Sequence, residues 1–158
     1  MISAITGKLI LASMITVSAM TWNVDGGAFK CWEDYRALTD TGSPQYELQT
    51  EAWTDRHGCR RFNGDYCIAL GSAYGSQIGT RYIVTLDTGK EFTAVLADQK
   101  ADCDTVQGHT RDRHGAIIEF VVDSTMMPEA VRRAGDISMI PGMEGEVVEI
   151  RRLKNETN

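Results

Sequence analysis

The feature that most constrains the fold is a stretch that has the pattern of a β-hairpin. Residues 81–86 (RYIVTL) are rich in β-branched and aromatic side chains and read as a strand. Residues 87–90 (DTGK) have the composition of a turn, and residues 91–97 (EFTAVLA) form a second β-like run. An isolated hairpin is marginally stable in water, so further strands are expected to cover its apolar face.

Other short segments continue this β pattern. The additional β-like runs are residues 46–49, 52–54, 66–70, 116–122 and 145–150. Residues 128–134 (PEAVRRA) predict a short helix, with Pro in its first turn and Gly135 as its stop. Residues 28–50 predict a short helix or irregular arm, and residues 98–115 predict a polar loop. Short strands, Gly-containing turns and one or two short helices indicate a mainly β chain that forms a small barrel.

Length and charge exclude some classes of protein. A chain of 158 residues fits one domain that can bury its own core. Its 22 acidic and 16 basic side chains give a formal charge of −6, which argues against a nucleic-acid partner because such binding needs a basic face.

The N-terminal segment bears on the compartment. Residues 9–20 (LILASMITVSAM) form an uncharged run after Lys8, which is typical of a signal peptide. An uncleaved N-terminal anchor and a buried segment of a cytosolic protein are the alternatives. We therefore divide the chain into a signal peptide or anchor (1–20), an arm (21–49), a barrel domain (50–152) and a tail (153–158).

The order of the runs at 68–72, 78–86 and 88–98 resembles a double-psi β-barrel. The same order, with Ile78-Gly79-Thr80 before the first hairpin strand, is similar to rare lipoprotein A, to expansins and to the three-aspartate domains of lytic transglycosylases. The resemblance covers roughly residues 50–152 and implies a six-stranded barrel. The whole chain also resembles small exported or prophage-associated clostridial proteins of no assigned function.

The resemblance implies an acidic catalytic site. Asp98 matches the catalytic Asp of these families, and Glu119 stands where they usually have a second Asp. Asp98 would be a general acid/base for glycan cleavage and Glu119 its partner carboxylate. His114 is a candidate positioning group because it lies just before Gly115 and the run at 116–122, although a polar surface residue is the alternative. Residues 98–101 read DQKA, where rare lipoprotein A has Asp-Arg-Gly-Pro, so the match to the fold is better than the match to the catalytic motif.

Substrate contacts are expected from the neighbouring loops. Trp53, Tyr74 and Tyr82 could stack on a sugar, or they could anchor the core, which is the more common use of such rings. Tyr74 lies in a Gly-flanked stretch and is the best candidate of the three for an exposed ring. Lys100 and Asp102 are the other expected substrate contacts. In the structural alternative, Asp98 caps its loop, and Glu119 is either solvated or paired with Lys100.

No metal or cofactor site is predicted. The acidic residues Asp98, Asp102 and Asp104 lack the Gly and Glu of a calcium loop. The loop that contains Cys103, His109 and His114 lacks the spacing of a zinc site.

The four cysteines leave alternatives open. In an exported chain, Cys59 could pair with Cys67 and Cys31 with Cys103, although other pairings are possible. The alternative is that these cysteines are buried thiols.

Three functions fit the sequence. The first is an exported lytic transglycosylase that cleaves peptidoglycan. The second is a non-catalytic module that binds cell-wall carbohydrate or serves in phage assembly. The third is a cytosolic barrel with a structural or protein-interaction role.

Overall fold

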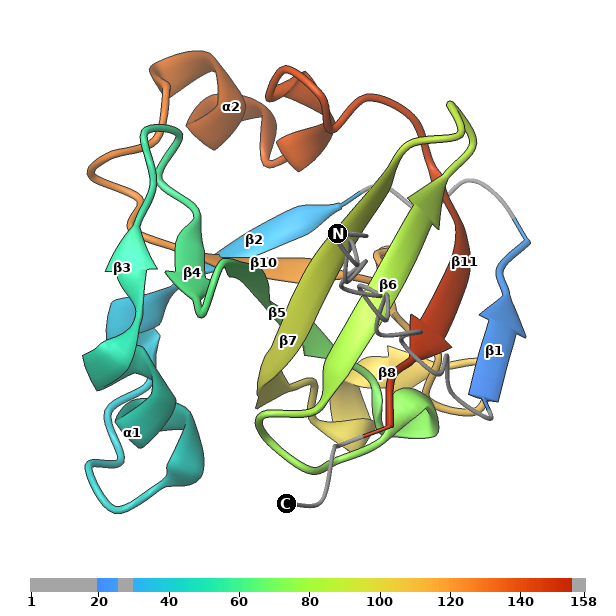
Figure 1. Ribbon diagram of the computed structural model, residues 1–158, viewed down its shortest axis with the longest axis horizontal. Helices are drawn as coiled ribbons and strands as arrows, with labels where there is room; N and C mark the ends of the chain where they lie inside the picture. Colours follow the sequence, from blue (N-terminus) through green and yellow to red (C-terminus); the bar gives the residue numbers. More distant parts are fainter. Residues whose placement is uncertain (1–19, 26–29, 155–158) are drawn as a thin grey trace, which may run out of the picture.

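The computed structural model describes residues 20–25 and 30–154, and it is mainly β (Figure 1). The strands are β1 (Met20–Asn23), β2 (Cys31–Asp34), β3 (Trp53–Thr54), β4 (Arg60–Phe62), β5 (Asp65–Leu70), β6 (Arg81–Leu86), β7 (Glu91–Gln99), β8 (Thr105–Val106), β9 (Arg111–Asp112), β10 (Glu119–Val122) and β11 (Val147–Arg152). The α-helices are α1 (Pro44–Glu51) and α2 (Glu129–Ala134), and the 3₁₀ turns are η1 (Tyr35–Ala37), η2 (Ser72–Tyr74), η3 (Asp102–Asp104) and η4 (Ile137–Met139).

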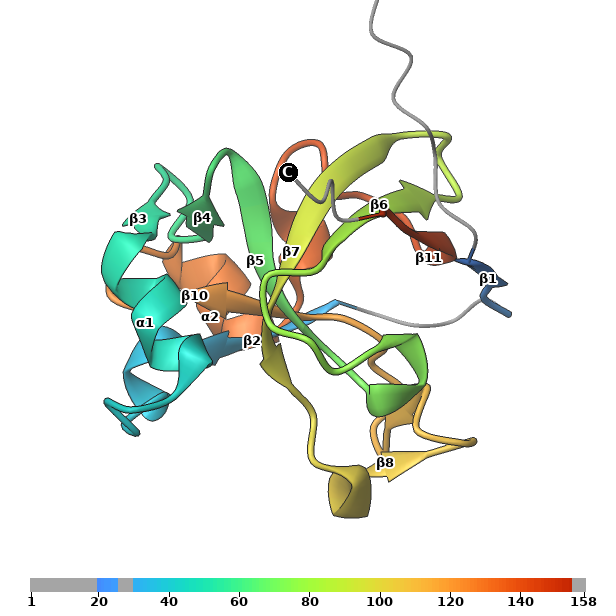
Figure 2. The ribbon, with the colours of Figure 1, turned by 60° about the horizontal axis from the view of Figure 1, so that its bottom comes forward.

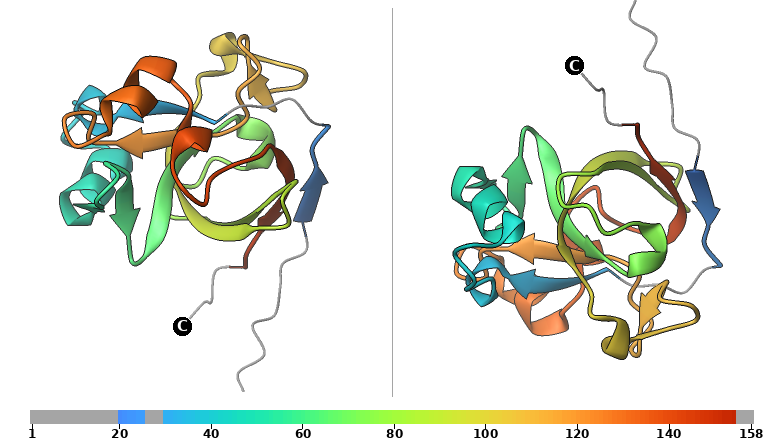
Figure 3. Two further views of the ribbon diagram at one scale, coloured as in Figure 1. Left: turned by 90° about the horizontal axis from the view of Figure 1, so that it is seen from above. Right: turned by 90° about the horizontal axis from the view of Figure 1, so that it is seen from below.

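Nine of the described strands form one mixed sheet that curls around a core (Figure 3), and β8 pairs with β9 in a separate two-stranded sheet. The order of the larger sheet is β1-β11-β6-β7-β5-β10-β2, with β3 and β4 attached beside β5. Two pairs are parallel, β5 with β7 and β2 with β10, and the remaining pairs are antiparallel. Among the described residues no strand pairing joins β1 to β2, which are the two ends of this path.

The local predictions with the strongest turn signals are confirmed. The hairpin at 81–97 is β6 and β7, which pair in register from Arg81 with Val95 to Thr85 with Glu91. The helix at 128–134 is α2, and Gly135 ends it in the left-handed conformation with φ 69°.

The prediction of a strand at residues 46–49 is wrong, because these residues lie in α1. Ser43 accepts a hydrogen bond from the Tyr46 backbone N–H at 3.1 Å, and Pro44 occupies the first turn. This N-cap and this Pro start a helix that local alternation does not reveal.

The segment expected to be an arm, residues 21–49, contributes to the sheet. Within it, β1 pairs with β11 and β2 pairs with β10, which lies far along the chain. The predicted signal peptide or anchor lies outside the described residues except for Met20. No described helix is long and apolar enough to cross a membrane.

Alternation along the strands separates two apolar clusters. The main core contains Ile68, Leu96 and Phe120, and its aromatic rings Tyr66, Phe92 and Phe120 lie 5.4–5.7 Å apart between centroids. The second, smaller cluster lies on the opposite face of the sheet, and α1 contributes to it. Its buried members are Leu48, Cys67, Val95, Ala97 and Val121.

A β-bulge in β7 moves Asp98 from one face of the sheet to the other. Ile68 of β5 pairs with Leu96, but the next residue, Ala69, pairs with Asp98, so Ala97 is the extra residue. Strict alternation would direct Asp98 into the main core with Leu96. The bulge instead directs Asp98 to the face that carries α1, as bulges near functional sites often do.

Candidate functional site

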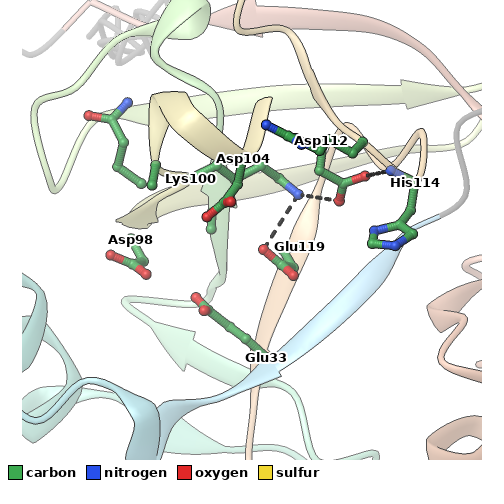
Figure 4. A pocket seen from close by; sticks show the side chains of 11 residues that line it. Glu33, Asp98, Lys100, Asp104, Asp112, His114 and Glu119 are labelled. Atoms are coloured by element: carbon green, nitrogen blue, oxygen red, sulfur yellow. Dashed lines mark hydrogen bonds and ion pairs between the residues drawn. The ribbon is translucent and has the colours of Figure 1, made fainter. Parts of the chain in front are cut away.

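A hollow lined by several acidic side chains lies where β7 ends and β10 begins (Figure 4). Its volume is about 350 Å³. It contains five carboxyl groups and two permanently basic side chains. Its lining residues are Glu33, Ala69, Asp98, Gln99, Lys100, Ala101, Asp104, Asp112, Arg113, His114 and Glu119.

The floor of this cavity is one row of residues across three strands. Asp98 of β7 pairs with Ala69 of β5, and Ala69 pairs with Glu119 of β10. Adjacent strands lie about 4.8 Å apart, so the two acidic residues are separated by roughly 10 Å along the sheet. The methyl group of Ala69 is too small to fill the space between them, and this leaves the hollow that the carboxylates face.

Lys100 supplies the positive charge inside the cavity. It is only 7% exposed, and its Nζ lies 3.0 Å from Asp112 Oδ2 and 3.4 Å from Glu119 Oε2. Burial opposes its ammonium form, but the surrounding acidic groups of Cys31, Glu119 and Asp112 outweigh this and raise the pKa of Lys100. The ion pair of Lys100 with Glu119 is one of the contacts expected in the structural alternative.

Asp112 joins this charged group to the loop above it. Besides its ion pair with Lys100, its other oxygen accepts hydrogen bonds from the backbone N–H groups of His114 at 2.8 Å and Ala116 at 2.9 Å. Burial would raise the pKa of Asp112, but Lys100 and these N–H groups lower it below its usual value. Asp112 therefore remains ionised and fixes the start of the segment that leads into β10.

The position of this loop depends on the absence of a side chain at Gly71. A Cβ atom there would lie 2.0 Å from the backbone oxygen of His109, so no larger residue fits without movement. Figure 2 shows the segment from η3 through β8 extending from the sheet below the end of β7. The close approach at Gly71 holds the polar loop against the chain after β5.

Glu33 is the functional candidate that the sequence analysis missed. It lies on β2 opposite Val121 of β10, and its carboxylate points into the cavity towards Asp98 and Glu119 (Figure 4). Burial, then the charges of Asp98 and Glu119, raise the pKa of Glu33 to about 8. The available signal was weak: residues 31 and 33 share one strand face, but a four-residue strand shows too little alternation to be recognised.

Asp98 has a polar partner from the arm. Gln45, in the first turn of α1, donates from Nε2 to Asp98 Oδ1 at 3.4 Å. The carboxylate of Asp98 is half-buried and lies in the open cavity. The position of Asp98 therefore favours a role in the cavity over a role as a cap of its loop.

Of the other expected site residues, His114 and Lys100 line the cavity, whereas Tyr74 and Asp102 do not. The prediction of an exposed Tyr74 ring is wrong. The side chain is 2% exposed and packs edge-to-face on Trp22, with ring centroids 5.2 Å apart. The 3₁₀ turn η2 directs this ring into the core, and Tyr82 is likewise buried.

Asp102 is exposed on the outer side of the loop. It accepts a hydrogen bond from Ser72 Oγ at 2.6 Å and lies 3.5 Å from His109 Nδ1. It therefore ties the loop to η2 rather than facing the cavity. Trp53 is 55% exposed on β3 and is not among the lining residues.

One trio has the donor atoms of a metal site. Potential ligand atoms of Cys31, Asp112 and Glu119 lie within 4.8 Å of one another. Lys100 already neutralises both carboxylates of this trio, and burial followed by the charge of Glu119 raises the pKa of the Cys31 thiol. A neutral thiol beside an ammonium group is a poor ligand set for a cation, so we assign no metal to it.

All four cysteines are free thiols. Cys59 belongs to the main core, whereas Cys67 belongs to the cluster on the opposite face of the sheet. The expected Cys59–Cys67 pairing is not formed because the two side chains point to different faces. The expected pairing of Cys31 with the exposed Cys103 is also not formed.

Comparison of the chain with known protein families and with curated proteins finds no match. The geometry of the cavity is therefore the basis for the functional argument that follows.

Proposed function

We propose that the cavity is the active site of an exported enzyme that cleaves the glycan strands of peptidoglycan, with the chemistry of a lytic transglycosylase. The observation that carries the proposal is the placement of Asp98 and Glu119 on either side of Ala69, at the floor of an open polar cavity. A transglycosylase needs a group that protonates the glycosidic oxygen and a group that accepts a proton from the sugar's own attacking hydroxyl. Asp98 is the general acid/base in this proposal.

The topology supports the fold to which this chemistry belongs. The curled sheet has two parallel pairs, β5 with β7 and β2 with β10, embedded among antiparallel pairs. This mixture is compatible with the proposed six-stranded double-psi barrel. Export through the N-terminal segment is part of the same proposal, because peptidoglycan lies outside the membrane.

The cavity also indicates a polar substrate. No Phe, Tyr or Trp is among its lining residues, and its polar groups are carboxylates, an ammonium group, a guanidinium group, an amide and an imidazole. Such a lining suits a polyhydroxylated ligand that is held by hydrogen bonds more than by stacking.

The test is digestion of purified peptidoglycan sacculi by the purified protein, with mass spectrometry of the soluble products. The expected products are muropeptides that end in an anhydro sugar. Asp98→Asn should lower their yield by about 100-fold or more, which is the usual contribution of an acid/base group. Asp102→Asn is the matched control, because Asp102 is an exposed aspartate of the same loop and lies outside the cavity.

The second candidate is a non-catalytic module that binds wall carbohydrate or serves in phage assembly. The observation that favours it is the ion pair between Glu119 and Lys100, which occupies the second carboxylate. Wild-type protein that sediments with sacculi and releases no product from any preparation would support this module and contradict the enzyme.

A further inference from the structure

Glu33 reaches the cavity from a part of the chain that lies outside the proposed barrel. Strand β2 runs parallel to β10, and Glu33 faces the same side of the sheet as its partner Val121, whose side chain is in the cluster beside α1. In Figure 4 the carboxylate of Glu33 lies below those of Asp98 and Glu119 and points towards them. Its Oε1 is buried and has no hydrogen-bond partner among the described residues.

The charges around Glu33 are mostly negative. Asp98 faces it from β7, Glu119 from β10, Asp112 from β9 and Asp104 from η3. The cations of the lining are Lys100 and Arg113, and His114 is exposed at the rim.

These cations are engaged elsewhere. The ammonium group of Lys100 contacts Asp112 and Glu119, and Arg113 donates to the backbone oxygen of Cys103 at 2.8 Å. An ionised Glu33 would therefore face several carboxylates without a cation of its own. Like charges in a partly buried site cannot all be ionised at little cost, so one of these groups keeps its proton.

The hydrogen bonds decide which carboxyl group that is. Glu119 has an ammonium group at 3.4 Å, and Asp98 accepts from the amide of Gln45 at 3.4 Å. Both carboxylates therefore have a nearby donor. Glu33 has neither kind of contact, and burial together with its acidic neighbours keeps it protonated near neutral pH.

We propose that Glu33 is the general acid of the cavity, that it shares one proton with Asp98, and that Gln45 is a positioning residue for Asp98. This assignment rests on the proposed function and gives the acid and base roles to two different residues. Asp98, which accepts a hydrogen bond from Gln45, is then the base rather than the acid. The arm is in that case part of the catalytic machinery and not a cover over it.

The step balances within the cavity. Glu33 gives its proton to the glycosidic oxygen as the bond from that oxygen to the anomeric carbon breaks. The sugar's own hydroxyl then forms a new bond to the anomeric carbon, and its proton passes to Asp98. Transfer of that proton from Asp98 to Glu33 restores the starting state, and no water is consumed.

The first test measures the proton itself and needs no activity. Carboxyl ¹³C NMR of the full chain, labelled at Glu and Asp, should show Glu33 titrating well above an ordinary glutamate, and Asp98→Asn should move that titration downwards. Glu51→Gln, an exposed glutamate at the end of α1, is the matched control and should leave it unchanged. Titration of Glu33 near 4.5 in the wild-type protein would overturn the assignment, whether or not glycan is cleaved.

The second test uses turnover of sacculi. Glu33→Gln should lower the rate by about 100-fold or more and remove the alkaline limb of the pH profile. Gln45→Leu should lower kcat several-fold with little change in KM, because Asp98 loses the donor that positions it. Full activity of Glu33→Gln would contradict the role of Glu33 and leave the proposed function intact. A wild-type protein with no activity would overturn the proposed function, and with it the catalytic role of Glu33, even if the NMR titration shows the retained proton.

Discussion

Two buried lysines show how differently one residue type is used in this molecule. Lys30 is wholly buried, and its Nζ donates to Ser138 Oγ at 2.8 Å and to the backbone oxygen of Gly145. Lys100 is nearly as buried, but its Nζ faces the carboxylates of Asp112 and Glu119. The first lysine has neutral oxygens as its direct partners, and the second has anionic ones.

The surroundings give the two amines opposite pKa shifts. Burial lowers the pKa of Lys30, and the more distant charges of Asp136 and Asp87 only partly oppose it. At Lys100 the acidic neighbours outweigh burial and raise the pKa. Lys30 therefore serves to fasten the chain before β2 to the loop before β11, whereas Lys100 sets the charge of the cavity. The predictions below separate these two roles.

The largest effect is expected from removal of the fastening lysine. Lys30→Ala leaves a cavity and an unsatisfied carbonyl at Gly145, so the free energy of unfolding should fall by about 3 kcal/mol. Urea unfolding at pH 7 measures this loss. Lys30→Met, which retains most of the volume, should lose clearly less, and equal losses in the two variants would show that packing at Lys30 contributes nothing.

Replacement of Lys100 should lower the free energy of unfolding by less than replacement of Lys30, and the size of this loss should depend on pH. Lys100→Met leaves Asp112 and Glu119 without their cation, and a loss of about 2 kcal/mol is expected at pH 7. The folded-state pKa of Asp112 is lowered, so its contribution exists above the unfolded value near 3.9 and disappears as pH falls through the folded value. Unfolding at pH 7 and pH 3 should therefore show a smaller mutational loss in acid. A loss that is equal at both pH values would place Lys100 with Lys30 as a fastening residue.

Glu33→Gln should stabilise the protein at alkaline pH. The pKa of Glu33 is raised to about 8, so the folded state binds more protons than the unfolded state between roughly pH 4.5 and 8. Wild-type stability from this group therefore falls as pH rises through that window, and the variant lacks this fall. At pH 8.5 the variant should be more stable by about 1–2 kcal/mol, with equal stability near pH 4.5. Parallel stability curves for the two proteins would contradict the protonated state assigned to Glu33.

The smallest effects are the alkaline slopes of the two lysines. A lowered folded-state pKa means that the contribution of Lys30 to stability rises with pH, from its folded value up to about 10.4. The raised folded-state pKa of Lys100 means that its contribution to stability is complete below about pH 10.4. This contribution is lost as pH rises through the folded-state pKa. The differences between wild type and each methionine variant, measured from pH 8.5 to 11, should have slopes of opposite sign and about 1 kcal/mol or less in size. Slopes of the same sign would remove the contrast between the two sites.

Local signals in the sequence account for the parts of the fold that were predicted. The hairpin β6–β7 has its turn residues and alternation within a single stretch, and α2 has Pro128 and Gly135 at its ends. Asp98 and Glu119 were predicted to share a site by resemblance, and Lys100 and His114 were predicted from the neighbouring loop; all four line the cavity.

What the sequence could not supply depends on distant partners. Glu33 reaches the site because β2 pairs with β10, and nothing within four residues signals that pairing. Tyr74 is flanked by glycines, which predicts exposure, but the partner that buries it is Trp22, from β1. The bulge at Ala97 is visible only once β5 lies beside β7, although it decides which way Asp98 faces.

The small size of Ala69 means that a single substitution could block the cavity. The depth of the hollow between Asp98 and Glu119 is set by one small side chain that carries no charge and takes no part in the proton transfers. A larger apolar residue at this position would act as a plug that leaves every titratable group in place. The variant Ala69→Leu would therefore separate loss of ligand binding from loss of the acid/base groups. Comparing what the wild-type protein and this variant bind in the cell would identify the ligand of the cavity.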